Sequence, residues 1–140
     1  MKKKIAILGS TGSIGKTTIK LIKKDVRNFE IVLLTANSNI NELSKQVRFF
    51  NVKNVVITDK KKFVEFKNKL KNKDVNIYND INSINKIFKK KIDYTMCSIA
   101  GLNGLRPTLD AIKFSKTVAI ANKEAIICGW NLIKKKINTL

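Results

Sequence analysis

The clearest candidate for chemistry is the glycine-rich segment Gly9–Gly15, which follows the apolar run Ile5–Leu8. Glycine allows a tight turn at a strand end and lets the backbone approach a ligand closely, while the start of a following helix presents unpaired N–H groups to an anion. Thr11 and Ser13 add hydroxyl donors to the same turn. The G-x-x-G-x-x-G spacing therefore predicts a phosphate-binding loop of the kind that opens dinucleotide-binding domains. A glycine-rich turn without a ligand is the alternative.

Gly15-Lys16-Thr17 also resembles the end of the loop that nucleotide hydrolases use to bind phosphates. The G-x-x-x-x-G-K pattern of that loop needs a glycine at position 10, where this chain has Ser10. No later strand ends in an aspartate suited to hold Mg²⁺. The sequence therefore favours dinucleotide binding over nucleotide hydrolysis.

The end of the second expected strand bears on the choice of dinucleotide. In domains that prefer NAD, an acid about 20 residues after the loop binds the ribose hydroxyls. Here the strand ends in Asn37-Ser38-Asn39, without an acid. Neutral donors at this place suit the 2′-phosphate of NADP. The alternative is that Ser38 or Asn39 caps the next helix, and one residue can have both roles.

Two segments in the second half also follow expected strands, where an open sheet places its ligands. One is the small-residue turn Ser98–Thr108. The other is Asn122-Lys123-Glu124, which sets an amide, a cation and a carboxylate in succession. Lys123 is suited to hold an anionic or carbonyl group of a substrate, and Asn122 and Glu124 to orient a cofactor.

Short apolar runs alternate with longer amphipathic segments along the chain, and this alternation predicts the elements that carry these residues. Strands are expected at Ile5–Leu8, Glu30–Ala36, Asn54–Thr58, Val75–Tyr78, Asp93–Ile99 and Thr117–Ala121. Helices are expected at Ile14–Lys24, Ile40–Phe50, Asp59 to about Lys71, Asp80–Lys90, Gly104–Phe114 and Lys123–Lys136. The order predicts an α/β fold, a Rossmann-like doubly wound, mostly parallel sheet with helices on both faces. We expect one domain over residues 1–140.

The composition argues against several classes of function. Histidine is absent, which removes a Ser-His-Asp triad, a histidine base and a histidine metal ligand. The cysteines, Cys97 and Cys128, match neither a zinc site nor a disulfide framework. The apolar run near Met1 is too short for a secretory signal, and no run approaches the ~20 residues of a membrane span. We expect a cytoplasmic protein with no membrane partner.

The net charge of +19 raises the alternative of a basic nucleic-acid-binding module. Lys, Asn and Ile, which share AT-rich codons, are all abundant, whereas arginine, the residue favoured for contacts to phosphate and guanine, is scarce. Drift in codon usage therefore explains the charge better, and we expect no nucleic-acid partner.

Taken together, the motifs closely resemble the 1-deoxy-D-xylulose 5-phosphate reductoisomerase family. The segments that carry the resemblance are Ile7–Gly15, Ala100–Leu102 with Gly104–Leu109, and Ala119–Glu124. They occur in the same order along essentially the whole chain. The resemblance implies the N-terminal, NADPH-binding portion of a longer enzyme, one that converts 1-deoxy-D-xylulose 5-phosphate to 2-C-methyl-D-erythritol 4-phosphate in the non-mevalonate route to isoprenoids.

The resemblance also implies a role for individual residues. It assigns NADPH binding to Thr11, Gly12, Ser13, Ile14, Asn37, Ser38, Asn39, Asn122 and Glu124, and binding of the sugar phosphate substrate to Lys123. Ligands for the family's divalent metal, Mg²⁺ or Mn²⁺, and the catalytic residues are expected beyond residue 140, so this portion is expected to be inactive alone. A homodimer is expected for the full-length enzyme. Another NADP-dependent oxidoreductase, related to semialdehyde or homoserine dehydrogenases, remains the alternative.

Overall fold

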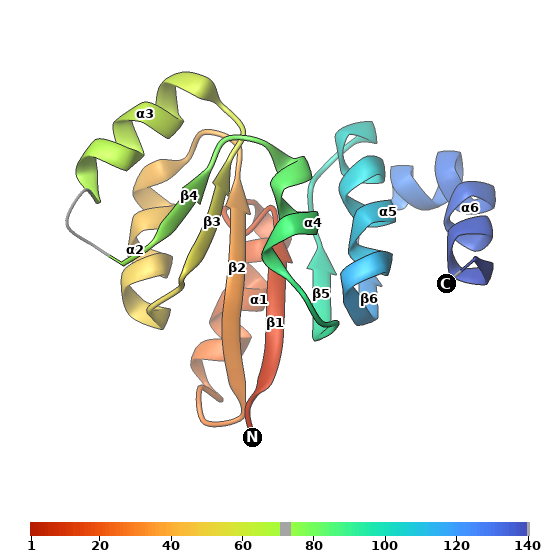
Figure 1. Cartoon of the computed structure of the whole chain (residues 1–140), viewed down its shortest axis with the longest axis horizontal. Coiled ribbons are helices and arrows are strands. Elements are labelled where there is room, and N and C mark those ends of the chain that lie inside the picture. Colours follow the sequence, from red (N-terminus) through yellow and green to blue (C-terminus); the bar gives the residue numbers. More distant parts are fainter. Residues whose placement is uncertain (71–73, 140) are drawn as a thin grey trace.

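Within the residues that the computed structural model describes, 1–70 and 74–139, six parallel strands form one sheet (Figure 1). Its order is β4-β3-β2-β1-β5-β6. The strands are β1 (Lys3–Leu8), β2 (Phe29–Ala36), β3 (Asn54–Ile57), β4 (Asn76–Tyr78), β5 (Ile92–Cys97) and β6 (Ser115–Ile120). The helices are α1 (Ser13–Lys23), α2 (Ile40–Phe50), α3 (Lys60–Lys69), α4 (Ile84–Ile87), α5 (Leu105–Phe114) and α6 (Lys123–Asn138), with 3₁₀ turns at Ile81–Ser83 and Leu102–Gly104.

The two faces of the sheet are covered by different helices because alternate residues of a strand point to opposite sides. In β1, Ile5 and Ile7 belong to a core cluster with apolar side chains of α1, α2 and α3. Ala6 and Leu8 belong to a second cluster with side chains of α4 and α5. The predicted α/β fold with helices on both faces is therefore confirmed, and the sheet is parallel throughout.

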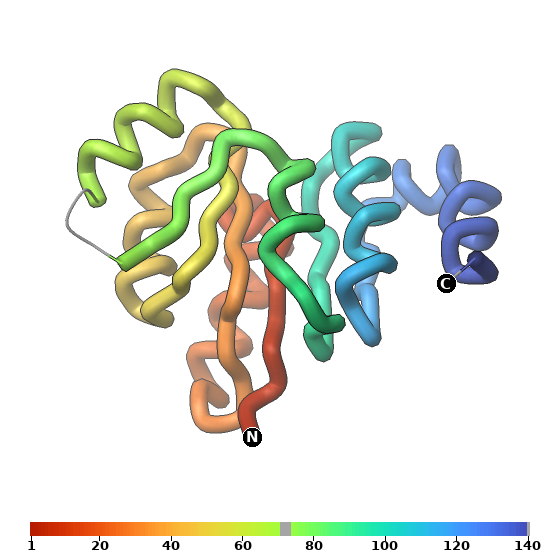
Figure 2. The backbone as a smooth tube through the Cα atoms, viewed as in Figure 1, coloured from red at the N-terminus to blue at the C-terminus, as the bar shows by residue number. Residues whose placement is uncertain are grey.

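The strand order reverses direction at β1, which pairs with β2 on one side and with β5 on the other. Leu8, at the end of β1, lies opposite Cys97, at the end of β5. The chain trace in Figure 2 leads outward from β1 to β4 and then returns to add β5 and β6 on the other side. Such a reversal separates the loops that follow the two central strands, and it is where open α/β sheets bind ligands.

One predicted helix is much shorter than the sequence indicated. The segment Asp80–Lys90 forms a 3₁₀ turn capped by Asp80 and a single α-helical turn that ends at Ile87. Phe88 takes an extended backbone conformation and packs its ring 5.4 Å from that of Phe114. The half-buried Phe88 ring packs against the second core cluster and three lysines follow it, and we attribute the early end of the helix to this packing.

Other predicted boundaries differ from the observed ones by one or two residues. The strands predicted to end at Thr58, Ile99 and Ala121 end at Ile57, Cys97 and Ile120. The predicted helix end near Lys71 lies outside the described residues. Within the described residues, no helix is both long enough and apolar enough to cross a bilayer.

Candidate functional site

The tight turn after β1 requires glycine at position 9. Gly9 has a φ of +83°, in the left-handed region, and a Cβ added there would lie 2.9 Å from the carbonyl oxygen of Ser98. The N–H of Gly9 donates to Oγ1 of Thr35 over 2.9 Å, and the N–H of Ser10 donates to the Thr35 carbonyl over 2.9 Å. The end of β2 therefore fixes the start of the loop, as predicted for a tight glycine turn.

The start of α1 is left without a side-chain cap. Gly12 occupies the N-cap position, and no described side chain bonds to the first N–H groups of the helix, which has no acid in its first turn. A Cβ at Gly15 would lie 2.6 Å from Cα of Ser10, so only glycine lets the loop fold back on the helix. Free N–H donors and the positive end of the helix dipole therefore lie together at the start of α1.

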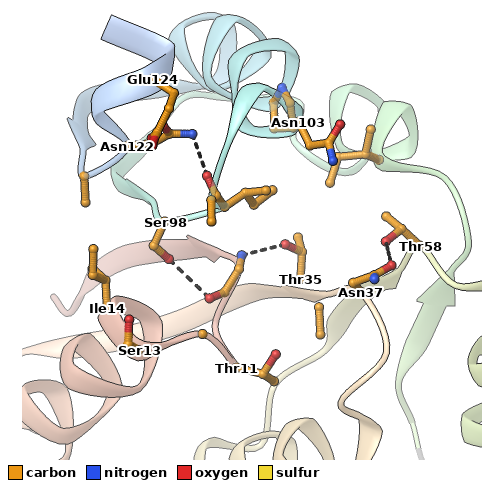
Figure 3. Close-up of a pocket in the computed structure, with 18 of the residues that line it drawn as sticks. Thr11, Ser13, Ile14, Thr35, Asn37, Thr58, Ser98, Asn103, Asn122 and Glu124 are labelled. Atoms are coloured by element: carbon orange, nitrogen blue, oxygen red, sulfur yellow. Dashed lines mark hydrogen bonds between the residues drawn. The ribbon is translucent and has the colours of Figure 1, made fainter. Parts of the chain in front are cut away.

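These N–H groups face a cavity of about 840 Å³ between the ends of the strands. Figure 3 shows Thr11, Ser13 and Ile14 on one side of it, Asn122 and Glu124 on the opposite side, and Asn37 with Thr58 at one end. Of the predicted site residues, eight line the cavity: Thr11, Gly12, Ser13, Ile14, Asn37, Asn122, Lys123 and Glu124. The volume falls in the range typical of small-molecule and cofactor sites.

Asn37 is oriented by Thr58, the residue just after the neighbouring strand β3. The Thr58 hydroxyl donates to Oδ1 of Asn37 over 2.8 Å, and the N–H of Asp59 donates to the Asn37 carbonyl over 3.1 Å. Because the amide oxygen already accepts a hydrogen bond from Thr58, the NH₂ group of Asn37 is the part available to a ligand.

The other two residues predicted at this turn do not line the cavity. Ser38 and Asn39 are exposed. Oδ1 of Asn39 accepts a hydrogen bond of 3.1 Å from the N–H of Glu42 and caps α2. The capping role that the sequence allowed for this turn therefore belongs to Asn39.

Asn122 joins two loops of the site. Its Nδ2 donates to the carbonyl oxygens of Ile99 and Gly101, each over 2.6 Å, and its Oδ1 accepts from the N–H of Ala125 over 3.1 Å. The side chain is 4% exposed. Both of its N–H donors are therefore used to hold the loop after β5 against the start of α6.

Lys123 and Glu124 begin α6 beside this junction. Lys123 is exposed and Glu124 is half-buried, and both line the cavity. Sequence position alone predicted these two residues at the site, because the carboxyl ends of parallel strands meet at one edge of the sheet.

Arg106 is a cavity residue that we did not predict individually. It lies in α5, and its Nε donates to Oδ2 of Asp110 over 3.2 Å, while Nζ of Lys113 bonds to Oδ1 of the same carboxylate over 2.9 Å. Burial raises the pKa of Asp110, but the hydrogen bonds and positive charges of Lys113 and Arg106 outweigh it and lower the pKa below its ordinary value. A buried carboxylate thus anchors a cation at the cavity.

Thr35, Thr58 and Ser98 were also missed as individual residues. Thr35 is the last but one residue of β2, and Thr58 and Ser98 each follow directly after a strand, so a place near a strand end was the only sequence signal. Oγ of Ser98 donates to the Leu8 carbonyl over 2.7 Å. These hydroxyls join neighbouring strand ends and so shape the loops around the cavity.

The described residues do not form a metal site. No group of three or more Asp, Glu, His or Cys side chains gathers anywhere in residues 1–70 and 74–139.

A parallel sheet with a glycine turn at its reversal point and an uncapped helix start defines a dinucleotide-binding domain of the Rossmann type. The family model for 1-deoxy-D-xylulose 5-phosphate reductoisomerase matches residues 5–129. The chain belongs to this family, which confirms the resemblance found in the motifs.

Curated relatives agree with this assignment. The chain is 60% identical over 137 residues to the 1-deoxy-D-xylulose 5-phosphate reductoisomerase of Pelagibacter ubique, covering 96% of this chain and 35% of the relative. It is 43% identical over 138 residues to that of a Thermoanaerobacter species, covering 96% and 36%. The chain therefore spans about a third of the length of these relatives.

Solved structures match as well. The 1-deoxy-D-xylulose 5-phosphate reductoisomerase from Zymomonas mobilis, solved in complex with NADPH, superposes with a TM-score of 0.90 at 32% identity over 99% of this chain and 37% of that one. A reductoisomerase in complex with NADPH, fosmidomycin and magnesium gives 0.89 at 26% identity over 98% and 34%. A homoserine dehydrogenase from S. aureus gives 0.52 at 19% identity, which shows a shared fold alone.

Proposed function

We propose that this chain is the NADPH-binding part of a 1-deoxy-D-xylulose 5-phosphate reductoisomerase. The observation that carries the proposal is the set of free N–H groups at the start of α1, which lines the same cavity as Asn37. Family membership and the NADPH complex of a structural relative support the choice of ligand.

The pyrophosphate of the cofactor would lie at the start of α1. The N–H groups of Thr11, Ser13 and Ile14 would donate to its oxygens, and the helix dipole favours its negative charge. The N-cap residue Gly12 has no Cβ that would stand in the way of this approach.

The 2′-phosphate would lie at the end of β2. The NH₂ group of Asn37 is available as a donor, and its orientation is fixed by Thr58. The nearest acid in α2, Glu42, accepts a hydrogen bond from Gln46. Asn39 would act on this region through the cap of α2, and Ser38 through the turn that joins Asn37 to it.

The nicotinamide would lie toward the start of α6. Asn122 would position the loop after β5, and Glu124 would contact the cofactor. Bound NADPH supplies a hydride to a substrate carbonyl. Lys123, the exposed cation beside this end of the cavity, would hold the anionic substrate, 1-deoxy-D-xylulose 5-phosphate, in reach of that chemistry.

The reaction requires residues that this chain does not provide. We place the ligands of Mg²⁺ or Mn²⁺ and the rest of the substrate site in the remaining two-thirds that the relatives possess. A cytoplasmic homodimer is proposed for the whole enzyme, with a sugar phosphate as its substrate and with 2-C-methyl-D-erythritol 4-phosphate as its product.

The proposal is tested in the natural protein that carries this chain. NADPH oxidation, followed by loss of the reduced nicotinamide absorbance, should require both 1-deoxy-D-xylulose 5-phosphate and a divalent cation. Lys123→Met should raise the KM for the sugar phosphate or lower kcat, with NADPH affinity unchanged, whereas Lys134→Met, an exposed lysine further along α6, should change neither. Absence of substrate-dependent NADPH oxidation in the wild-type protein would reject the proposed function.

A further inference from the structure

Gln46 is a buried polar residue beneath the phosphate loop. It lies in α2, 2% exposed, and its Nε2 donates to the carbonyl oxygen of Ser10 over 3.1 Å. The same nitrogen donates over 3.0 Å to Oε1 of Glu42, one helical turn earlier. Both neighbours are acceptors, so it is the nitrogen of the Gln46 amide, and not its oxygen, that must face the loop.

This contact decides where a neighbouring N–H group points. The carbonyl of Ser10 and the N–H of Thr11 belong to one peptide group, and in a trans peptide they point in opposite directions. The Ser10 carbonyl points inward to Gln46, so the N–H of Thr11 points outward, to the side on which Thr11 lines the cavity. Among the described residues, no group accepts a hydrogen bond from that N–H.

The arrangement leaves two buried polar atoms unmatched. Oγ of Ser10 and Oε1 of Gln46 have no hydrogen-bond partner in the part of the chain that the structure describes. An apolar side chain of the same length at position 46 would fill the space without a buried amide. Gln46 is thus less favourable for packing than an apolar residue, yet its amide donates to the loop. This combination indicates a role at the site.

The loop has few other restraints on this peptide group. Thr35 holds the N–H groups of Gly9 and Ser10, but it does not contact the peptide group between Ser10 and Thr11. A flip of that peptide group rotates ψ of Ser10 and φ of Thr11 together, and it would turn the Ser10 carbonyl outward and the Thr11 N–H inward. Gln46 is therefore the described side chain whose hydrogen bond opposes a flip.

We propose that Gln46 is a positioning residue that keeps the N–H of Thr11 directed at the cofactor pyrophosphate. The inference rests on the proposed function, because it assumes that NADPH occupies the cavity. The pyrophosphate is common to NADPH and NADH, so loss of the Gln46 donor weakens both cofactors by the same factor. A residue at the 2′-phosphate would instead affect NADPH alone.

The first test uses Gln46→Met in the natural protein that carries this chain, with cofactor binding followed by nicotinamide fluorescence. The Kd values of NADPH and NADH should both rise about tenfold, and the KM for NADPH should rise with kcat unchanged. In ¹H–¹⁵N spectra, the Thr11 amide signal should lose its shift on NADPH addition, whereas the Ser13 signal should keep it. Leu43→Val, a buried apolar change in the same helix, should lower stability without these effects.

A milder pair of variants covers the case in which Gln46→Met does not fold. Glu42→Ala removes the second acceptor that orients the Gln46 amide, whereas Glu42→Gln keeps an acceptor oxygen, and both remove the same charge. Glu42→Ala should bind NADPH about threefold more weakly than Glu42→Gln. Equal Kd values for this pair, or wild-type cofactor binding by a folded Gln46→Met, would overturn the inference. If the wild-type protein itself bound no NADPH, the proposed function would fail instead.

Discussion

The hydroxyl of Thr58, just after β3, donates a 2.8 Å hydrogen bond to Oδ1 of Asn37, just after β2. Thr58 thereby orients the side-chain amide of Asn37 at the end of the cavity. The oxygen of that amide is occupied and its NH₂ group is left for a ligand. In the proposed function, this NH₂ group is the donor to the 2′-phosphate at a strand end that has no acid.

Asn37→Asp should reverse the preference between cofactors. The new carboxylate can still accept the Thr58 hydrogen bond, so the turn should keep its shape, but it replaces the free NH₂ donor with a negative charge. The Kd of NADPH should rise roughly 10- to 100-fold, as expected for loss of a charge-assisted hydrogen bond, while NADH affinity should hold or improve. Fluorescence titration of both cofactors measures the change.

Asn39→Asp is the matched control for charge. Aspartate caps a helix as well as asparagine does, and residue 39 does not line the cavity. The variant adds the same charge two residues further along, so it should weaken NADPH binding by less than about threefold. An equal loss of affinity in both variants would point to the electric field of the turn and not to contact by Asn37.

Gly12 and Gly15 should respond differently to alanine. A Cβ at residue 15 would overlap the loop backbone, so Gly15→Ala should lower the free energy of unfolding by about 1 to 3 kcal/mol. A Cβ at residue 12 would have ordinary contacts within the protein but would stand where the pyrophosphate approaches. Gly12→Ala should therefore fold normally and bind NADPH less tightly. Urea denaturation and cofactor titration of both variants separate the two effects, and similar unfolding free energies would contradict the prediction.

The two cysteines should differ in reactivity. Cys97, at the end of β5, is 3% exposed, and burial raises the pKa of its thiol to about 11, although the Thr108 hydroxyl partly opposes this. Cys128 in α6 is exposed. Because the thiolate is the reactive form, an excess of a thiol reagent at neutral pH should modify one cysteine in the folded chain and both in denaturant. Rapid modification of Cys97 in the native state would contradict the described packing of β5.

Asp110 should make stability depend on acid pH. Its pKa is lowered in the folded protein, so its stabilising contribution is complete above the unfolded value of about 4 and is lost as the pH falls through the lower folded value. At neutral pH, Asp110→Asn should be less stable than the wild type by about 1 to 3 kcal/mol. The difference should shrink below about pH 4. Urea midpoints of both proteins across this range test the sign, and a constant difference would refute it.

The sequence predicted the order of elements because apolar period and turn residues are local properties. Six strands, the glycine turn and the Asn122–Glu124 segment could be placed in this way. The helix at Asp80–Lys90 could not be placed, because the packing of Phe88 on Phe114, far along the chain, overrides its local pattern.

Contacts between strand ends also could not be predicted from the sequence. The roles of Thr35, Thr58 and Arg106 depend on which strands become neighbours, and no spacing in the chain reveals that order. The sequence also could not show that Asn37 lines the cavity whereas Ser38 and Asn39 do not. Neighbouring residues of one turn can have different roles, and here Asn39 caps α2.

We propose that the cavity at the ends of β1 and β5 binds NADPH in preference to NADH. Titration of the 140-residue chain with each cofactor, followed by nicotinamide fluorescence with circular dichroism as a check on folding, tests it most directly. Saturable binding of NADPH with a Kd at least about tenfold lower than that of NADH is the expected result. Equal affinities, or no binding by a chain with a folded α/β spectrum, would contradict it.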